Sequence, residues 1–253
     1  MVSVVMPAYN AAKTIRSSIE SIQAQTFQDW ELIVIDDGSK DCTADILREM
    51  AATDGRIRFL QNEKNSGASY TRNRAVALAT GEWIAFLDSD DMWRHDKLEK
   101  QVALAELHSD MVVSYTASSF IDDEGNSYGY IMPAIERMTY KQLLRKNLMS
   151  CSSVMIRASV MKSIRMPNDQ MHEDYYVWLT VVKECGVAYG INEPLLIYRL
   201  CANSKSSNRF KSAKMLFNSY RAVRYDAVFS CFLVFRYMFY SVDKRRRIYR
   251  SVK

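Results

Sequence analysis

Short apolar runs alternate with helical patterns over the first 93 residues, and this alternation constrains the fold more than any other feature of the sequence. The apolar runs occupy 2–6, 31–35, 57–61 and 83–87, and segments with apolar residues at helical spacing lie between them at 11–23, 43–50 and 68–79. Repeated strand–helix units predict a mainly parallel sheet that helices cover on both faces. The expected fold class is therefore α/β.

The pattern changes after Trp93. We expect a charged helix at 96–108, antiparallel strands at 111–115, 119–122 and 128–132, a helix at 140–146, a strand at 153–156 and a helix at 173–184. Residues 211–250 predict one or two helices rich in aromatic side chains. These patterns divide the chain into a domain at 1–205, with halves at 1–93 and 94–205, and a basic helical tail at 206–253.

Composition excludes several classes of protein. Hydrophobic residues make up 48% and charged residues 25% of the 253 residues, as in folded globular proteins. The five cysteines form no CxxC pair, so they predict neither a disulfide framework nor a zinc site, and they suit a reducing cytoplasm. The N-terminal stretch VSVVMPAYN lacks the basic leader and long apolar segment of a secretory signal. We therefore expect a cytoplasmic protein.

Three of the predicted strands run into polar or acidic turns. These turns are Met6-Pro7-Ala8-Tyr9-Asn10, Asp36-Asp37-Gly38-Ser39 and Asp88-Ser89-Asp90-Asp91. Ligands of parallel sheets bind beyond the carboxyl ends of the strands. We therefore expect the three turns to converge on one site.

The third turn places three carboxylates, of Asp88, Asp90 and Asp91, within four residues. Like charges at this spacing repel and raise one another's pKa unless a cation neutralises them. Mg²⁺ and Mn²⁺ prefer oxygen ligands, and Mg²⁺ is commonly held by one or two carboxylates together with substrate phosphates. The turn therefore indicates a metal site for a phosphorylated ligand. The alternative is that Asp90 or Asp91 caps the next helix.

Three further polar residues each allow a functional and a structural interpretation. Asp37 accepts hydrogen bonds from a base or ribose, or it forms an Asx-turn. Arg72 reaches a phosphate or the acidic cluster, or it lies on a solvated helix face. Asp174 acts as a general base towards an acceptor hydroxyl, or it only suits the dipole at the start of its helix.

Five segments, taken in order, are similar to a known enzyme family. VSVVMPAYN, QTFxxWELIVIDDGSxD, NxGASYTRNRA, GEWIAFLDSDD and HEDYYVWL together resemble the family 2 glycosyltransferases, over about residues 2–200. The resemblance implies the GT-A fold, with a Rossmann-like, mainly parallel central sheet flanked by helices and a smaller antiparallel region on the acceptor side. It also implies an inverting transfer from a nucleotide-sugar, most commonly a UDP-sugar, with Mg²⁺ or Mn²⁺ as cofactor.

The resemblance assigns the donor site to the first half of the chain. Pro7, Ala8 and Tyr9 would line the nucleotide base, and Asp37 would contact uracil or ribose. Arg72 would lie near the base and the acidic cluster.

The resemblance also assigns the metal ligands and the base. Asp88-Ser89-Asp90 stands at the DxD motif of the family, with Asp90 and Asp88 as metal ligands and Asp90 as the direct one. Asp174 would be the catalytic base, and Arg199 would close over the diphosphate. Cys201 stands where many relatives carry a histidine, so the resemblance supplies no third protein ligand for the metal.

The basic tail is compatible with a nucleic acid, an anionic membrane or a solvated helix, because residues 205–253 hold 13 Lys or Arg. Its apolar stretch at 227–242 is interrupted by Arg236 and is shorter than the roughly 20 residues that a spanning helix needs. Aromatic residues interleaved with basic ones suit an amphipathic helix in an anionic leaflet. The resemblance favours this membrane interpretation, and the alternative is a helix packed on the core or on a second subunit of a homodimer.

The expected function is transfer from a UDP-sugar to a hydroxyl of a saccharide on undecaprenyl diphosphate, at the cytoplasmic face of the inner membrane. The product would be a bacterial O-antigen, capsule or exopolysaccharide. One alternative, a sugar-phosphate nucleotidyltransferase, should have a Gly-rich basic loop that PAYNAAKTI lacks. Another is a non-catalytic nucleotide or RNA binder. We expect no nucleic-acid partner, since the acidic strand ends would repel a polyanion.

Overall fold

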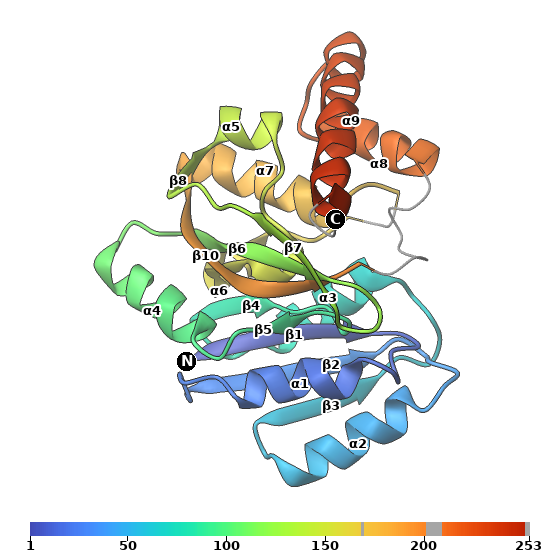
Figure 1. Cartoon of the computed structure of the whole chain (residues 1–253). Helices are drawn as coiled ribbons and strands as arrows, with labels where there is room; N and C mark the ends of the chain where they lie inside the picture. Colours follow the sequence, from blue (N-terminus) through green and yellow to red (C-terminus); the bar gives the residue numbers. More distant parts are fainter. Residues whose placement is uncertain (168–169, 201–208, 251–253) are drawn as a thin grey trace.

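A central sheet organises the computed structural model, which describes residues 1–167, 170–200 and 209–250 (Figure 1). Its strands are β1 (Val2–Ala8), β2 (Trp30–Asp36), β3 (Ile57–Gln61), β4 (Trp83–Phe86), β5 (Met92–Trp93), β6 (Val113–Ile121), β7 (Ser127–Met132), β8 (Arg137–Thr139), β9 (Met155–Arg157) and β10 (Val187–Arg199). Among the described residues these strands form one sheet in the order β3-β2-β1-β4-β9-β6-β10-β5, with β7 beside β6 and β8 beside β10.

The helices lie on both faces of the sheet, and those near the C-terminus gather on the side away from β3 (Figure 1). They are α1 (Ile15–Gln23), α2 (Thr43–Thr53), α3 (Ala68–Leu78), α4 (Lys97–Leu107), α5 (Tyr140–Arg145), α6 (Ala158–Ser163), α7 (Glu173–Cys185), α8 (Arg209–Ala222) and α9 (Ala227–Arg250). A short 3₁₀ helix, η1 (Cys151–Ser153), precedes β9.

The first half of the chain confirms the predicted parallel sheet. Strand β1 is parallel to β2 and to β4, and β2 is parallel to β3. Side chains alternate between the two faces of β2, so that Leu32 and Val34 share a core with Ile19 of α1, whereas Ile33 shares the opposite core with Ala75 of α3. Both faces of these strands are covered, which explains why they are nearly continuous apolar runs.

The second half differs from the prediction most in β6 and β10, and the short strand β8 and helix α6 were not predicted either. The strands expected at 111–115 and 119–122 are one strand, β6, whose small polar residues are buried in the middle of the sheet. Strand β10 was not predicted, because Pro194 and its polar neighbours resemble a turn. The ladder between β10 and β6 shifts register on both sides of Pro194, and these irregularities accommodate the missing N–H group.

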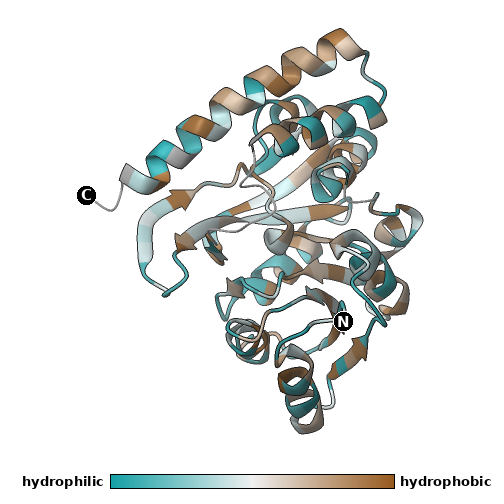
Figure 2. Ribbon diagram, turned by 90° about the vertical axis from the view of Figure 1, so that its right-hand side faces the viewer, coloured by the Kyte–Doolittle hydropathy of each residue, from teal (hydrophilic) through white to brown (hydrophobic). Residues whose placement is uncertain are grey.

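The tail forms two helices that pack on the second half. Tyr220 of α8 and Leu233 and Ile248 of α9 share a core with Trp178 of α7. The alternative of packing on the core is therefore correct for one face of α9, while the opposite face is exposed (Figure 2). The predicted boundary between residues 205 and 206 lies outside the described residues. None of the described helices combines the length and apolar character needed to cross a bilayer.

The close approach of β10 to the segment before β8 requires glycine at position 190. A Cβ atom on Gly190 would lie 2.2 Å from the carbonyl oxygen of Ile135 and 3.1 Å from the Tyr115 ring. We expect Gly190→Ala to lower the free energy of unfolding by about 1–3 kcal/mol, because the backbone must move. Urea unfolding followed by circular dichroism measures this. Gly55→Ala is the control, since its Cβ meets nothing within 4 Å, and equal effects of the two substitutions would contradict the prediction.

Candidate active site

The three polar strand ends lie next to one another, because β1 is hydrogen-bonded between β2 and β4. The N–H of Asp37 donates to the carbonyl of Ala8 (2.7 Å), and the N–H of Asn10 donates to Oγ of Ser39 (2.8 Å). The Thr14 hydroxyl, just before α1, donates to the carbonyl of Ser89 (2.8 Å). The convergence expected from the sequence is therefore present.

Asp37 uses its carboxylate to shape the loop before α3. Oδ1 accepts hydrogen bonds from the Asn62 amide (2.6 Å) and the Ser66 N–H (2.9 Å), and Oδ2 accepts one from the Gly67 N–H (2.8 Å). The side chain is buried, whereas Tyr9 at the neighbouring strand end is 44% exposed. The contact of Asp37 with uracil or ribose, and of Pro7, Ala8 and Tyr9 with the base, stay predictions.

Arg72 joins the acidic turn to the second half of the molecule. Its Nη2 lies 2.6 Å from Oδ1 of Asp88, and its Nη1 lies 3.1 Å from Oε1 of Glu173 at the start of α7. Arg72 is only 6% exposed, so the solvated-face interpretation is wrong. Removing one partner from a buried ion pair costs about 3–5 kcal/mol. The arginine thus fixes α7 relative to the turn after β4.

The carboxylates of the acidic turn differ in burial. Asp91 is buried, its Oδ1 accepts the N–H of Arg199 (2.9 Å), and its Oδ2 has no hydrogen-bond partner. Burial, reinforced by the charges of Asp90 and Asp88, raises the pKa of Asp91 well above its ordinary value. The capping alternative is wrong for both Asp90 and Asp91, because α4 begins at Lys97 with Asp96 as its N-cap.

Arg199 fastens this turn from β10. Its Nε donates to the carbonyl of Asp90 (3.1 Å), and its Nη1 donates to the carbonyls of Asp122 and Asp123 (3.0 and 3.1 Å). These contacts are to the protein backbone, so the expected contact of Arg199 with a diphosphate stays a prediction. Cys201, which occupies the position of the family histidine, lies outside the described residues.

The donor atoms near the turn suit a hard cation that is shared with a ligand. Among the described residues no group of three or more His, Cys, Asp or Glu side chains is arranged to hold a metal ion. Asp88 and Asp90 nevertheless supply two carboxylates from one turn, and Mg²⁺ is commonly held by that number together with phosphates. These residues therefore fit a divalent cation only if a ligand completes the coordination.

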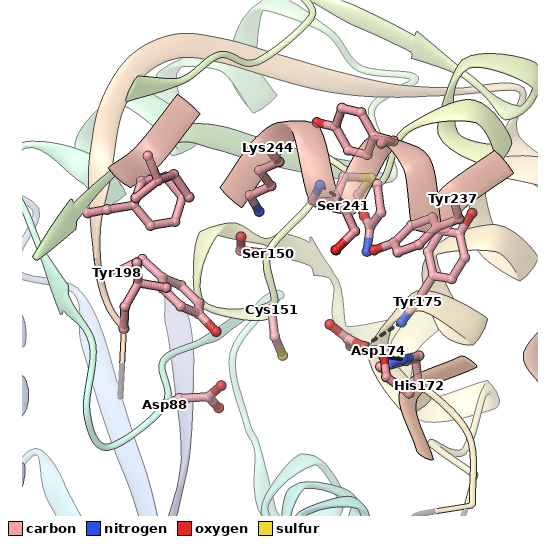
Figure 3. A pocket seen from close by; sticks show the side chains of 17 residues that line it. Asp88, Ser150, Cys151, His172, Asp174, Tyr175, Tyr198, Tyr237, Ser241 and Lys244 are labelled. Atoms are coloured by element: carbon pink, nitrogen blue, oxygen red, sulfur yellow. Dashed lines mark hydrogen bonds between the residues drawn. The ribbon is translucent and has the colours of Figure 1, made fainter. Parts of the chain in front are cut away.

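A pocket of about 260 Å³ opens beside the turn (Figure 3). Asp88 lines one side, and Asp174 of α7 lines another. Burial, followed by the charge of Glu173, raises the pKa of Asp174. A carboxylate with a raised pKa is a stronger base, so Asp174 is suited to take a proton from a hydroxyl in this pocket.

Several residues of the pocket were missed in the sequence. Tyr198, Tyr237, Ser241 and Lys244 all line it. Tyr237, Ser241 and Lys244 come from α9, and no local pattern predicts that a tail helix returns to the site. Burial and the carboxylates around it raise the pKa of Tyr198, which keeps its hydroxyl protonated.

His172 connects the site to the tail. Its ring Nε2 lies 3.0 Å from Oγ of Ser212, and its backbone N–H donates to Oγ of Ser219 (3.2 Å). Both serines belong to α8. The start of α7, which carries Asp174, is therefore held from one side by Arg72 and from the other by α8.

Known proteins are similar to this chain in sequence and in fold. Glycosyl transferase family 2 matches residues 3–165. A Bacillus subtilis protein named as the teichuronic acid biosynthesis glycosyltransferase TuaG is 40% identical over 223 residues, 88% of each chain. The Escherichia coli UDP-Glc:alpha-D-GlcNAc-diphosphoundecaprenol beta-1,3-glucosyltransferase WfgD is 37% identical over 216 residues, 85% of this chain and 83% of that one.

Solved structures show the same architecture. TarS 1–349 of S. aureus in complex with UDP-GlcNAc superposes with a TM-score of 0.73 at 20% identity, covering 92% of this chain and 70% of that one. The mannosyltransferase PcManGT from Pyrobaculum calidifontis, in complex with GDP-Man and Mn²⁺, superposes with a TM-score of 0.67 at 18% identity. The match covers 92% of this chain and 69% of that one. The expected GT-A fold is thereby confirmed. The chain belongs to glycosyltransferase family 2 and is a transferase.

Proposed function

We propose that this transferase moves a sugar from a UDP-sugar to a hydroxyl of a lipid-linked saccharide, with inversion at the anomeric carbon, in the synthesis of a bacterial surface polysaccharide. The observation that carries the proposal is that Asp88 and Asp174, from opposite halves of the chain, line one pocket. The relatives support the substrate classes, since WfgD is named for a UDP-Glc donor and a diphosphoundecaprenol-linked acceptor, and TarS was solved with UDP-GlcNAc.

The donor nucleotide would lie across the ends of β1 and β2. Tyr9 presents an exposed ring there, with Pro7 and Ala8 beside it. The loop that Asp37 holds through the N–H groups of Ser66 and Gly67 forms the adjoining wall. Aromatic and backbone groups of this kind bind a base by stacking and by hydrogen bonds.

Asp90 and Asp88 would hold Mg²⁺ or Mn²⁺ together with the donor diphosphate, with Ser89 between them. Arg72 engages Oδ1 of Asp88, which leaves Oδ2 to face a cation. When bound, the cation stabilises the negative charge on the leaving diphosphate.

Asp174 would act as the base. The carboxylate takes the proton of the acceptor hydroxyl, and that oxygen forms a bond to the sugar C1 as the bond from C1 to the diphosphate breaks. The attack comes from the face opposite the leaving group, so a single displacement inverts C1. The Arg72–Glu173 contact next to Asp174 keeps the base in position.

The exposed face of α9 would lie in the cytoplasmic leaflet of the inner membrane. Val228, Phe232, Phe235 and Phe239 form a stripe at helical spacing and are 83%, 55%, 64% and 63% exposed. Exposed Arg246 continues the stripe towards the C-terminus. An apolar stripe that ends in basic residues suits an anionic lipid surface better than a second copy of this basic chain.

Replacing the proposed base tests the reaction. We expect Asp174→Asn to lower kcat by about 10²–10⁴, because the amide cannot accept the hydroxyl proton. UDP release from a UDP-sugar in the presence of a lipid-linked acceptor measures kcat. The UDP affinity of this variant should stay within about threefold of the wild-type value, because Asp174 would contact the acceptor hydroxyl and not the nucleotide.

Two further measurements make this test specific. Glu184→Gln, an exposed change at the other end of α7, should leave kcat unchanged. In the unsubstituted enzyme, kcat should fall as the pH drops through a pKa above the ordinary aspartate value of 3.8, because burial raises the pKa of Asp174 and the base must be ionised. Full activity of Asp174→Asn would contradict the proposed role, and intact UDP binding without any transfer by the wild type would indicate a non-catalytic nucleotide binder.

Membrane binding has its own test. The double substitution Phe235→Ser and Phe239→Ser should weaken binding to vesicles of phosphatidylglycerol and phosphatidylethanolamine by at least about tenfold, because each buried ring contributes roughly 1.5–3 kcal/mol. Co-sedimentation with vesicles measures the partition. Leu107→Ser on α4, where the side chain is 78% exposed, is the control. A wild-type dimer in solution that the double substitution dissociates would instead identify α9 as a subunit interface.

A further inference from the structure

Helix α9 presents its second face to the active-site pocket. Tyr237, Ser241, Lys244 and Ile248 line the pocket and follow one another at intervals of four, three and four residues. This spacing places them on one side of the helix, opposite the exposed stripe of Val228, Phe232, Phe235 and Phe239. One helix therefore forms both the outer apolar surface and a wall of the site.

The two walls of the pocket differ in charge. Asp88 from the turn after β4 and Asp174 from α7 are the acidic residues of the lining, whereas Lys244 of α9 is the only Lys or Arg among the described residues that line the pocket. Figure 3 shows Lys244 extending from α9 into the space above Asp88, with Ser241 on the same helix and Ser150 across from it. Its Nζ lies 5.4 Å from the centre of the Phe120 ring.

The wall around Lys244 is equipped to bind an anion. An ammonium group supplies three donors, the hydroxyls of Ser150 and Ser241 lie close to Lys244 in Figure 3, and Asn147 also lines the pocket. Hydrogen bonds from a charged donor to a phosphate are about twice as strong as neutral ones. The acidic wall, by contrast, repels an anion unless a cation is bound there.

We propose that Lys244 binds a phosphate of the acceptor, so that this phosphate lies against α9 while the hydroxyl of the acceptor sugar reaches Asp174. The identity of the acceptor as a lipid diphosphate rests on the proposed function. The donor diphosphate is assigned to the turn at 88–90, on the opposite wall, so Lys244 serves the second substrate. The family model matches residues 3–165, so α9 lies outside the matched segment.

The dimensions of a helix support this arrangement. An α-helix with its side chains is about 10 Å across. If the apolar stripe of α9 lies at the boundary between acyl chains and head groups, its pocket face lies about one helix diameter closer to the protein, on the head-group side of that boundary. A prenyl chain then remains in the leaflet while its diphosphate meets Lys244.

Binding of farnesyl diphosphate to the full chain tests the proposal. Calorimetry is done with UDP and Mg²⁺ in excess, so that the donor site is filled. We expect Lys244→Met to weaken farnesyl diphosphate binding by about 10- to 100-fold, the loss expected for a charged hydrogen bond. Lys244→Arg should stay within about threefold of the wild type, because it keeps the charge.

The controls separate the acceptor from the donor. Lys183→Met changes an exposed basic residue near the end of α7, away from the pocket and from α9, and should leave farnesyl diphosphate binding unchanged. UDP affinity, measured alone, should be the same in the wild type and in both Lys244 variants. A loss of UDP affinity in Lys244→Met would assign the lysine to the donor and overturn the proposal.

The remaining outcomes are also decisive. Inorganic pyrophosphate should bind more weakly than farnesyl diphosphate but with the same dependence on Lys244, and equal affinities would overturn the assignment to a lipid. Undiminished farnesyl diphosphate binding by Lys244→Met, or no binding by the wild type, would overturn the site itself. A wild type that binds farnesyl diphosphate through Lys244 but never binds UDP would instead refute the proposed donor and leave this site standing.

Discussion

The candidate active site depends on a buried arginine that neutralises carboxylates from both halves of the chain. Arg72 of α3 pairs with Asp88 after β4 and with Glu173 at the start of α7. Burying a guanidinium is unfavourable unless charges of opposite sign surround it. The two carboxylates meet this requirement only if α7 is docked against the strand ends. The same contacts that stabilise the ion pairs therefore place Asp174, the neighbour of Glu173, beside the pocket that Asp88 lines.

The acids of the sequence motifs serve different purposes in the folded chain. Asp37 organises the loop before α3, and Asp91 accepts a hydrogen bond from the backbone N–H of Arg199 at the end of β10. Asp88 and Asp174 face the pocket. The buried carboxylates of Asp37 and Asp91 support the carboxylates that face the pocket, because they fix the loops from which a metal and a nucleotide would be bound. Acidic residues that look alike in the sequence are thus separated by burial into structural ones and ones that face the pocket.

The sequence predicts the parallel half well because each strand and helix there has a clear local period. Leu32 to Ile35 alternate between two covered faces, and Ile15, Ile19 and Ile22 mark one side of α1. Strand β10 has no such signal, because Pro194 interrupts it and its pairing with β6 joins segments far apart in the chain. The same holds for the pocket. Lys244 stands in a run of basic residues that resembles a solvated surface, and only the packing of α9 on α7 and β6 brings it to the site.

Under the proposed function, the strand-end carboxylates would bind a metal and a nucleotide diphosphate together. Calorimetry of UDP with and without Mn²⁺, on the wild type and on Asp90→Ala, tests it most directly, with the exposed Asp45→Ala as control. We predict that Mn²⁺ tightens UDP binding by at least about tenfold in the wild type and in the control, and that Asp90→Ala loses this gain. UDP binding that is equally tight with and without metal in all three proteins, or no UDP binding at all, would contradict it.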